Sequence, residues 1–125
     1  MLNQDKARAF LGARIVLNNL YYGEIWGLNV RTFEAAGIGA FQMVDWRLGL
    51  DQLFEDGKEL ISFRGMNDLQ EKVDVWLNRS EERLAIANAG KRRAHADHTY
   101  RLRLSLLLDT LAQRTNGFPM PRCSN

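Results

Sequence analysis

Cysteine is nearly absent from this sequence, since Cys123 is the only one among 125 residues. A single cysteine forms no internal disulfide, which excludes the disulfide-stapled scaffolds of small secreted proteins. Charged residues interrupt the N-terminal segment 1–14, so we expect no signal peptide there. No apolar run approaches the roughly 20 residues of a membrane-spanning helix. These absences predict a cytoplasmic protein without a transmembrane segment.

A large charge excess is also missing, because 17 Lys and Arg residues face 15 Asp and Glu residues. The net charge of +2 is too small to suggest a nucleic-acid partner. The charge is unevenly distributed, with net −3 (8 basic, 11 acidic) over residues 1–78 and net +5 (9 basic, 4 acidic) over residues 79–125. The basic excess lies around Lys91, Arg92, Arg93, Arg101 and Arg103. It is either a solvated helical face or a patch for an acidic surface or anionic lipid, which leaves peripheral membrane contact open.

The sequence also lacks internal repeats and low-complexity segments. It contains neither of the two glycine-rich phosphate motifs, G-x-x-x-x-G-K-[ST] and G-x-G-x-x-G. What is present fits one globular domain, with 46% hydrophobic and 26% charged residues. We place that domain at residues 1–115. Residues 116–125 form a predicted flexible tail, because the segment 117–121 gathers helix-breaking residues.

Short apolar runs predict three buried strands, over residues 14–18, 39–45 and 60–63. Helices are predicted between them. The first has Asn29 as its N-cap, runs from 30 to 36 and stops at Gly37, and the second covers 48–54. This alternation predicts an α/β fold with a parallel sheet. Because three strands make a thin sheet, we expect further strands before residue 1 and therefore a chain truncated at its N-terminus.

Helices are predicted for the rest of the chain. Asn67 and Ser80 are the predicted N-caps of two of them, and a last helix begins near Thr99. The first of these helices carries one apolar stripe, formed by Leu69, Val73, Trp76 and Leu77. The last helix has one leucine face, formed by Leu104, Leu107, Leu108 and Leu111.

Ligands of open parallel sheets bind beyond the carboxyl ends of the strands, which here are followed by the loops 19–29 and 45–48. Gly27 lets a ligand approach the backbone, and the helix start at Asn29 offers free N–H groups to a phosphate. Arg31 adds a charge-assisted contact, and the Glu34 carboxylate suits the two adjacent hydroxyls of a sugar. Since many helices begin with Asn and contain Glu, a purely structural role stays open.

Other conspicuous residues also allow two interpretations. Asp45 forms a wall of the site, or it caps the next helix. The rings of Tyr21, Tyr22 and Trp26 stack on a base or sugar, or they pack under a neighbouring lobe. His95 and His98 have the spacing of helical metal ligands, but no third ligand is near, which favours a surface or helix-junction role.

A series of motifs resembles a known family. The run 29–41, NVRTFEAAGIGAF, is followed by Asp45, by Leu53-Phe54 and by a closing His98-Thr99-Tyr100. This series resembles the glycosyl transferases group 1 domain, in the subgroup of glycosyltransferases similar to the spore maturation protein CgeB. The similarity runs from about residue 14 to residue 112.

The resemblance implies the Rossmann-like C-terminal lobe of a GT-B glycosyltransferase, a three-layer domain with C-terminal helices. Such lobes bind a nucleotide-sugar donor without a bound metal or other cofactor, and an N-terminal lobe, missing here, holds the acceptor. Glu34 matches the family glutamate that binds the donor ribose, and Arg31 and Asn29 lie near the diphosphate. Gly27 and Asp45 complete the predicted donor-binding set, and catalytic residues are not identified.

The sequence departs from the family pattern at two points. Many retaining GT-B enzymes carry two glutamates separated by seven residues, and counting back from Glu34 reaches Trp26. The Lys and Arg that often clamp the phosphates are not evident. The alternative is therefore a non-catalytic nucleotide-sugar-binding or protein-interaction module. A flavodoxin-like regulatory domain is disfavoured, because Asn18-Asn19 stands where acidic residues would follow the first strand.

Overall fold

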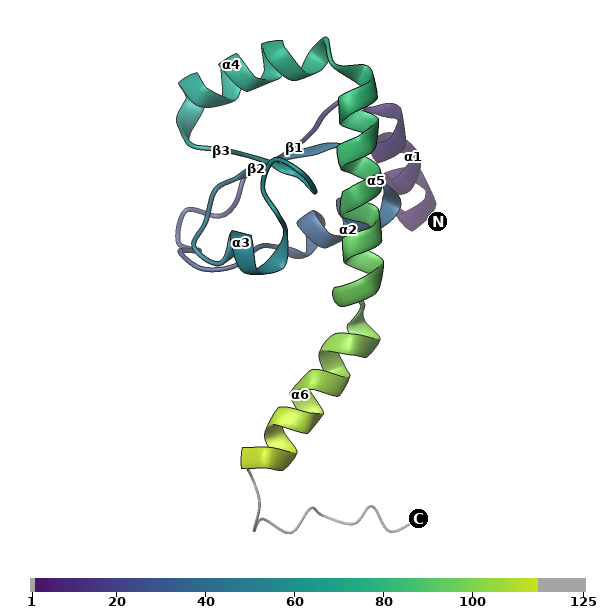
Figure 1. Cartoon of the computed structure of the whole chain (residues 1–125), viewed down its shortest axis with the longest axis vertical. Coiled ribbons are helices and arrows are strands. Elements are labelled where there is room, and N and C mark those ends of the chain that lie inside the picture. The colour runs from purple at the N-terminus through teal and green to yellow at the C-terminus, as the bar shows by residue number, and fades with distance from the viewer. Residues whose placement is uncertain (1, 115–125) are drawn as a thin grey trace.

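A parallel sheet of three strands forms the centre of the structure, with helices against both of its faces (Figure 1). The computed structural model describes residues 2–114. In chain order, the elements are α1 (Leu2–Gly12), β1 (Val16–Asn18), α2 (Val30–Ile38), β2 (Gln42–Asp45), α3 (Leu50–Leu53), β3 (Ile61–Phe63), α4 (Gly65–Leu77), α5 (Ser80–Asp97) and α6 (Tyr100–Arg114). This order confirms the predicted α/β fold with a Rossmann-like parallel sheet.

The strands lie where the apolar runs predicted them, although each is shorter than its run. β1, β2 and β3 lie in that order, with Val16 opposite Gln42 and Met43 opposite Ile61. β1 starts at Val16, whose N–H donates to the carbonyl oxygen of Phe41 at 2.9 Å. The prediction that β1 begins at residue 14 is therefore wrong by two residues.

Two hydrophobic clusters cover the two faces of the sheet and give the predicted three layers. Val44 of β2 points into the first cluster and Met43 into the second. The first cluster joins Val44 to residues of α2, α3 and α5, namely Ala36, Leu50 and Ala94, and to Leu20, Phe54 and Leu60. The second joins Met43 to residues of β3, α4 and α5, namely Ile61, Phe63, Leu69, Ile86 and Ala87, and to Phe41. Burial of each large apolar side chain contributes roughly 1.5–3 kcal/mol to the free energy of folding, so the two clusters hold the edge of the sheet in place.

α2 begins at the predicted cap but ends later than predicted. The Asn29 side chain accepts the Thr32 N–H, as an N-cap does. Gly37 lies inside the helix, so the prediction that it stops α2 is wrong. Gly39 ends the helix, because its φ of 91° is left-handed and its N–H bonds back to the carbonyls of Ala35 and Ala36. The strand predicted from residue 39 therefore starts only at residue 42.

The predicted cap of α4 is wrong. The helix begins at Gly65, two residues before Asn67, because the Asp68 carboxylate accepts the Arg64 N–H at 2.7 Å. That bond, together with the Lys72 ammonium at 3.0 Å, lowers the pKa of Asp68 below its usual value. The helix start is therefore stabilised by a carboxylate reaching back, and the Asn67 side chain does not cap it.

α5 lies across the segments that lead into β2 and β3. Its N-cap is Arg79, so Ser80 is the first helical residue and the prediction that Ser80 caps it is wrong. Gly90 lies directly against the backbone of Glu59, where a Cβ would be only 2.4 Å from the carbonyl oxygen. Because Gly90 has no side chain, α5 can lie close to the Glu59 backbone, and its C-terminal end then lies beside α2.

α6 extends away from the rest of the molecule, and none of its residues is buried (Figure 1). It starts where predicted, with the Thr99 hydroxyl accepting the Leu102 N–H at 3.3 Å. Its exposed leucines are Leu102, Leu104, Leu106, Leu107, Leu108 and Leu111. Within residues 2–114, no helix has the length and apolarity needed to cross a membrane. The predicted tail, residues 116–125, lies outside the described residues.

Candidate functional site

A buried polar network joins the carboxyl end of β1 to the amino end of α2. The Asn18 side chain is fully buried and donates to Asn29 Oδ1 at 2.9 Å and to Thr32 Oγ1 at 2.8 Å. Asn29 Nδ2 donates back to Asn18 Oδ1 at 3.1 Å. Because each of these groups is satisfied, the network fixes the start of α2 at the sheet edge where ligands of such folds bind.

Three of the five predicted donor contacts lie around this helix start. Gly27 has a φ of 85°, which glycine adopts readily, and its N–H donates to the Leu48 carbonyl at 2.9 Å. The Asn29 side chain serves the helix cap and the network with Asn18. Arg31 is exposed, and within the described residues its guanidinium takes part in no ion pair. Arg31 is therefore a cation at the helix start that is open to a ligand.

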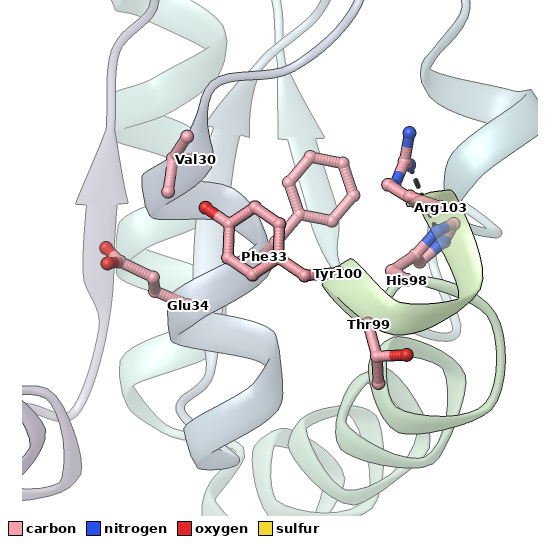
Figure 2. Close-up of a pocket in the computed structure, with 7 residues that line it drawn as sticks. All are labelled: Val30, Phe33, Glu34, His98, Thr99, Tyr100 and Arg103. Carbon is pink, nitrogen blue, oxygen red and sulfur yellow. Dashed lines mark hydrogen bonds between the residues drawn. The ribbon is translucent and has the colours of Figure 1, made fainter. Parts of the chain in front are cut away.

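Glu34 lies one turn further along α2, at the rim of a pocket of about 410 Å³ (Figure 2). Its side chain is 39% exposed. The residues that line the pocket come from α2 and from the junction of α5 with α6; they are Val30, Phe33, Glu34, His98, Thr99, Tyr100 and Arg103. The volume falls in the range of roughly 300–1,000 Å³ that is typical of small-molecule sites.

The wall opposite Glu34 is held together by hydrogen bonds and ring contacts. His98 Nε2 lies 2.5 Å from the Leu53 carbonyl oxygen and Nδ1 lies 3.2 Å from Arg103 Nη2. Since a carbonyl only accepts and a guanidinium only donates, these two contacts fit the tautomer in which Nε2 donates to Leu53 and Nδ1 accepts from Arg103. The Arg103 guanidinium also lies 4.9 Å from the centre of the Phe33 ring. These contacts hold a cation at the pocket wall.

The Glu34 carboxylate forms an ion pair with the Lys6 ammonium of α1. In Figure 2 this carboxylate points away from His98 and Arg103, on the other side of the ring of Phe33. Both side chains are about two-fifths exposed (40% and 39%), and such pairs contribute at most about 1 kcal/mol. A ligand with two hydroxyl donors can therefore compete with Lys6 for this carboxylate.

The sequence pointed to Glu34 and to the segment 98–100 separately, and the structure brings them to one pocket. Sequence reasoning did not select Phe33 and Arg103 as site residues. Phe33 stands inside the run 29–41, which carries the family resemblance, and this was the available signal. Arg103 stood out only as one member of the basic excess, and its position follows from the turn between α5 and α6.

Asp45, the fifth predicted contact, lies in a different hollow at the carboxyl end of β2. Its Oδ2 is 2.9 Å from Arg47 Nη1. The alternative that Asp45 caps the next helix is wrong, because the N-cap of α3 is Gly49. This hollow measures about 460 Å³ and is lined by Tyr22, Glu24, Ile25, Asp45, Trp46, Arg47 and Leu48. Of the predicted set, Glu34 lines the first pocket and Asp45 lines this hollow, whereas Gly27, Asn29 and Arg31 line neither of them.

The two histidines bind backbone carbonyls. His95 Nε2 lies 2.9 Å from the Gly37 oxygen, and His98 bonds to Leu53 where α5 meets α6. This arrangement confirms the helix-junction interpretation. Among residues 2–114, no three His, Cys, Asp or Glu side chains are grouped as a metal site would need. That the site works without a metal stays a prediction.

The basic residues of α5 and α6 differ in their surroundings. Arg93 is paired with Asp97 at 2.8 Å and lies 3.9 Å from Glu59, and Arg103 is part of the pocket wall. Lys91 and Arg92 are exposed. Peripheral membrane contact therefore stays a prediction.

Comparison with known proteins agrees with this architecture. A family model described as glycosyl transferase-like matches residues 2–109. No curated protein and no solved structure matches the chain. The family match spans all three strands, both sides of the Glu34 pocket and most of α6. It indicates a general role in glycosyl transfer, and the Rossmann-like sheet is consistent with the C-terminal domain of such an enzyme. The chain therefore belongs to the glycosyl transferase-like family.

Proposed function

We propose that this chain is the donor-binding lobe of a GT-B glycosyltransferase and that the Glu34 pocket binds a nucleotide-diphosphate sugar. The observation that carries this proposal is the position of Glu34. Its side chain is about two-fifths exposed (39%) at the rim of a pocket, one turn inside a helix whose amino end lies at the carboxyl edge of the sheet. If Glu34 were buried, or if no hollow lay beside the helix start, the chain would have no site for the donor.

The ribose is the part of the donor that fits Glu34. Two adjacent hydroxyls can donate to the two carboxylate oxygens and replace the Lys6 ammonium there. The rings of Phe33 and Tyr100 lie beside Glu34 in the pocket, and Tyr100 is 76% exposed. Aromatic faces stack well on a nucleobase, so we place the base against these rings.

The diphosphate is placed at the amino end of α2. The first turn of a helix leaves N–H groups without helical partners, and the helix dipole adds partial positive charge there. Arg31 lies in that turn, and there is open space at Gly27 before it, because a Cβ there would meet no atom within 4 Å. Arg103 supplies a second cation across the pocket. Together these groups stabilise the charge of a leaving nucleotide diphosphate, which is the work of a metal in other enzymes.

The sugar end of the donor then points toward the carboxyl edge of the sheet, where Asp45 lies. An N-terminal lobe supplies the acceptor and the catalytic base, so we expect the chain by itself to bind the donor without turning it over. We assign the chain to the CgeB-like subgroup because the motif series from Asn29 to Tyr100 follows that pattern.

A second candidate function is a binding module that kept the fold and lost the chemistry. Trp26 favours it, because it stands where many retaining enzymes carry a glutamate. Its ring lies against Gly49, where a Cβ would be 3.0 Å from the ring. An assay of donor hydrolysis or transfer with the chain extended upstream separates the two functions. Turnover supports the enzyme, and tight donor binding without turnover supports the module.

Amide chemical-shift mapping of the full chain tests the location of the donor. We expect titration with UDP, GDP and their glucose conjugates to shift the amides of residues 27–34 and 98–103 for at least one ligand. The residues of α4 from 67 to 74 lie in a different hollow and serve as the internal control. Shifts concentrated on α4, or no shifts with any of these ligands at millimolar concentration, would contradict the proposal.

A further inference from the structure

Side chains close one edge of the sheet, the edge formed by β3. Phe63 accepts the Trp46 N–H on the side that faces β2. Since alternate residues of a parallel strand turn their backbone groups to opposite sides, Ser62 turns its N–H and carbonyl away from the sheet. The Asp56 carboxylate accepts the Ser62 N–H at 2.8 Å, and the Lys72 ammonium donates to the Ser62 carbonyl at 2.7 Å. A further strand could bond here only by displacing both side chains.

The opposite edge of the sheet, formed by β1, has no such cover. The Val16 N–H donates to the Phe41 carbonyl on the side that faces β2, so by the same alternation Leu17 turns its N–H and carbonyl outward. Within residues 2–114, no group bonds to this N–H or this carbonyl, and Leu17 is 50% exposed. An unpaired donor and acceptor on an extended backbone are a template for another strand.

The sequence around Leu17 also lacks the features that keep sheet edges apart. Native proteins protect an open edge with charged side chains, above all lysine, or with proline. The segment 15–20, IVLNNL, contains no charged residue and no proline. The β1 edge therefore suits an uncharged strand, and it has nothing that would repel one.

The β1 edge is complementary to itself. If two copies pair antiparallel with Leu17 opposite Leu17, a two-fold axis relates them, and each Leu17 N–H donates to the Leu17 carbonyl of the other copy. Ile15 and Asn19 then lie opposite each other on both sides of the axis. Arg14 lies opposite Leu20 in this register, so no like charges meet across the strands.

We propose that β1 of a second copy adds to this edge and joins the two three-stranded sheets into one sheet of six strands. Six strands are an ordinary number for a sheet, whereas three are few. The second copy thereby takes the place of the upstream strands that the thin sheet led us to expect. Because β1 has only three residues, the dimer is weaker than one with a standard interface, with a dissociation constant of roughly 100 μM. The inference does not rest on the proposed donor site.

Sedimentation velocity of the full chain from about 5 to about 500 μM tests the dimer. We expect Leu17→Lys to weaken it at least tenfold, because two ammonium groups then meet across the axis. The Leu17 side chain is half exposed, so the monomer should still fold, and an unchanged amide spectrum of residues 27–34 checks this. Leu107→Lys is the matched control, because Leu107 is a 53% exposed leucine of α6, and it should leave the dimer unchanged.

Amide hydrogen exchange of the unaltered chain tests the strand pairing without any substitution. The Leu17 N–H is bonded only in the dimer, so its exchange should slow at least fivefold between the lowest and the highest concentration. The Ser62 N–H is the internal control, because Asp56 already accepts it within one copy, and its exchange should not depend on concentration.

Four outcomes would overturn the inference. The chain sediments as a monomer at every concentration, or the Leu17 amide exchanges equally fast throughout. Leu107→Lys weakens the association while Leu17→Lys does not, which would assign the interface to α6. Finally, a chain extended upstream is monomeric and its Leu17 amide is protected at every concentration, which would assign the β1 edge to an upstream strand.

Discussion

At the scale of single residues, the site depends on side chains whose roles the sequence could not separate. Asn18 and Asn29 look alike in the sequence, but Asn18 is fully buried and Asn29 caps a helix. Glu34 was predicted from its motif, and the structure places it at a pocket. Its partner Lys6 was not predicted, because 28 residues separate the two and only the packing of α1 beside α2 brings them together.

Asn18→Ala tests how strongly the buried network holds the site. The substitution removes the acceptor of Asn29 Nδ2 and one donor to the Thr32 hydroxyl, and leaving buried polar groups unsatisfied costs about 1–3 kcal/mol. We therefore expect the free energy of unfolding, measured by urea denaturation, to fall by that amount. Asn19→Ala is the matched control, because Asn19 is exposed, and it should change the value by less than about 0.5 kcal/mol. Equal effects of the two substitutions would refute the structural role of the network.

At the scale of elements, the sequence patterns predicted where the strands and helices lie, but they predicted the first and last residues of these elements poorly. The apolar runs and the Asn29 cap are local signals, so β1 to β3 and the start of α2 follow from the sequence. Gly37 and Gly39 both look like helix stops, but only Gly39 has a left-handed backbone. α4 starts where it does because the Asp68 carboxylate accepts the Arg64 N–H. An Asn67 cap fits the local sequence equally well, so the sequence could not decide between the two starts.

The two helical glycines Gly37 and Gly90 should respond in opposite directions to alanine. A Cβ at Gly37 meets no atom within 4 Å, so Gly37→Ala should raise the free energy of unfolding by about 0.5–1 kcal/mol through helix propensity. A Cβ at Gly90 would lie 2.4 Å from the Glu59 carbonyl oxygen, and this overpacking should cost about 1–3 kcal/mol. Thermal and urea unfolding of both variants checks the signs. A stabilising Gly90→Ala would mean that α5 does not lie against Glu59.

At the scale of the whole molecule, the fold class follows from the alternation of strands and helices, but the pocket does not. The Glu34 pocket forms because α5 crosses to α2 and the chain then turns at His98 into α6. No local pattern in the sequence encodes that crossing. The sequence places leucines on one face of α6, and the structure leaves them exposed on a helix that extends away from the body (Figure 1).

Amide hydrogen exchange tests the uneven stability of the molecule. α6 buries no residue, whereas α5 buries Ile86, Ala87, Gly90 and Ala94. Short helices without tertiary packing are marginal in water, so we expect the α6 amides to exchange at least tenfold faster than those of residues 86–94. Equal protection of the two helices would show that α6 is covered in solution.

The central claim is that the Glu34 carboxylate binds the donor ribose, and isothermal titration with the nucleotide sugar that gives amide shifts tests it most directly. Losing hydrogen bonds to a charged group costs roughly 1.5–3 kcal/mol, so Glu34→Gln should weaken binding at least tenfold. Lys6→Met breaks the same ion pair but keeps the carboxylate, and it should leave the affinity unchanged or raise it. Unchanged affinity in Glu34→Gln, or the same loss in both variants, would contradict the account.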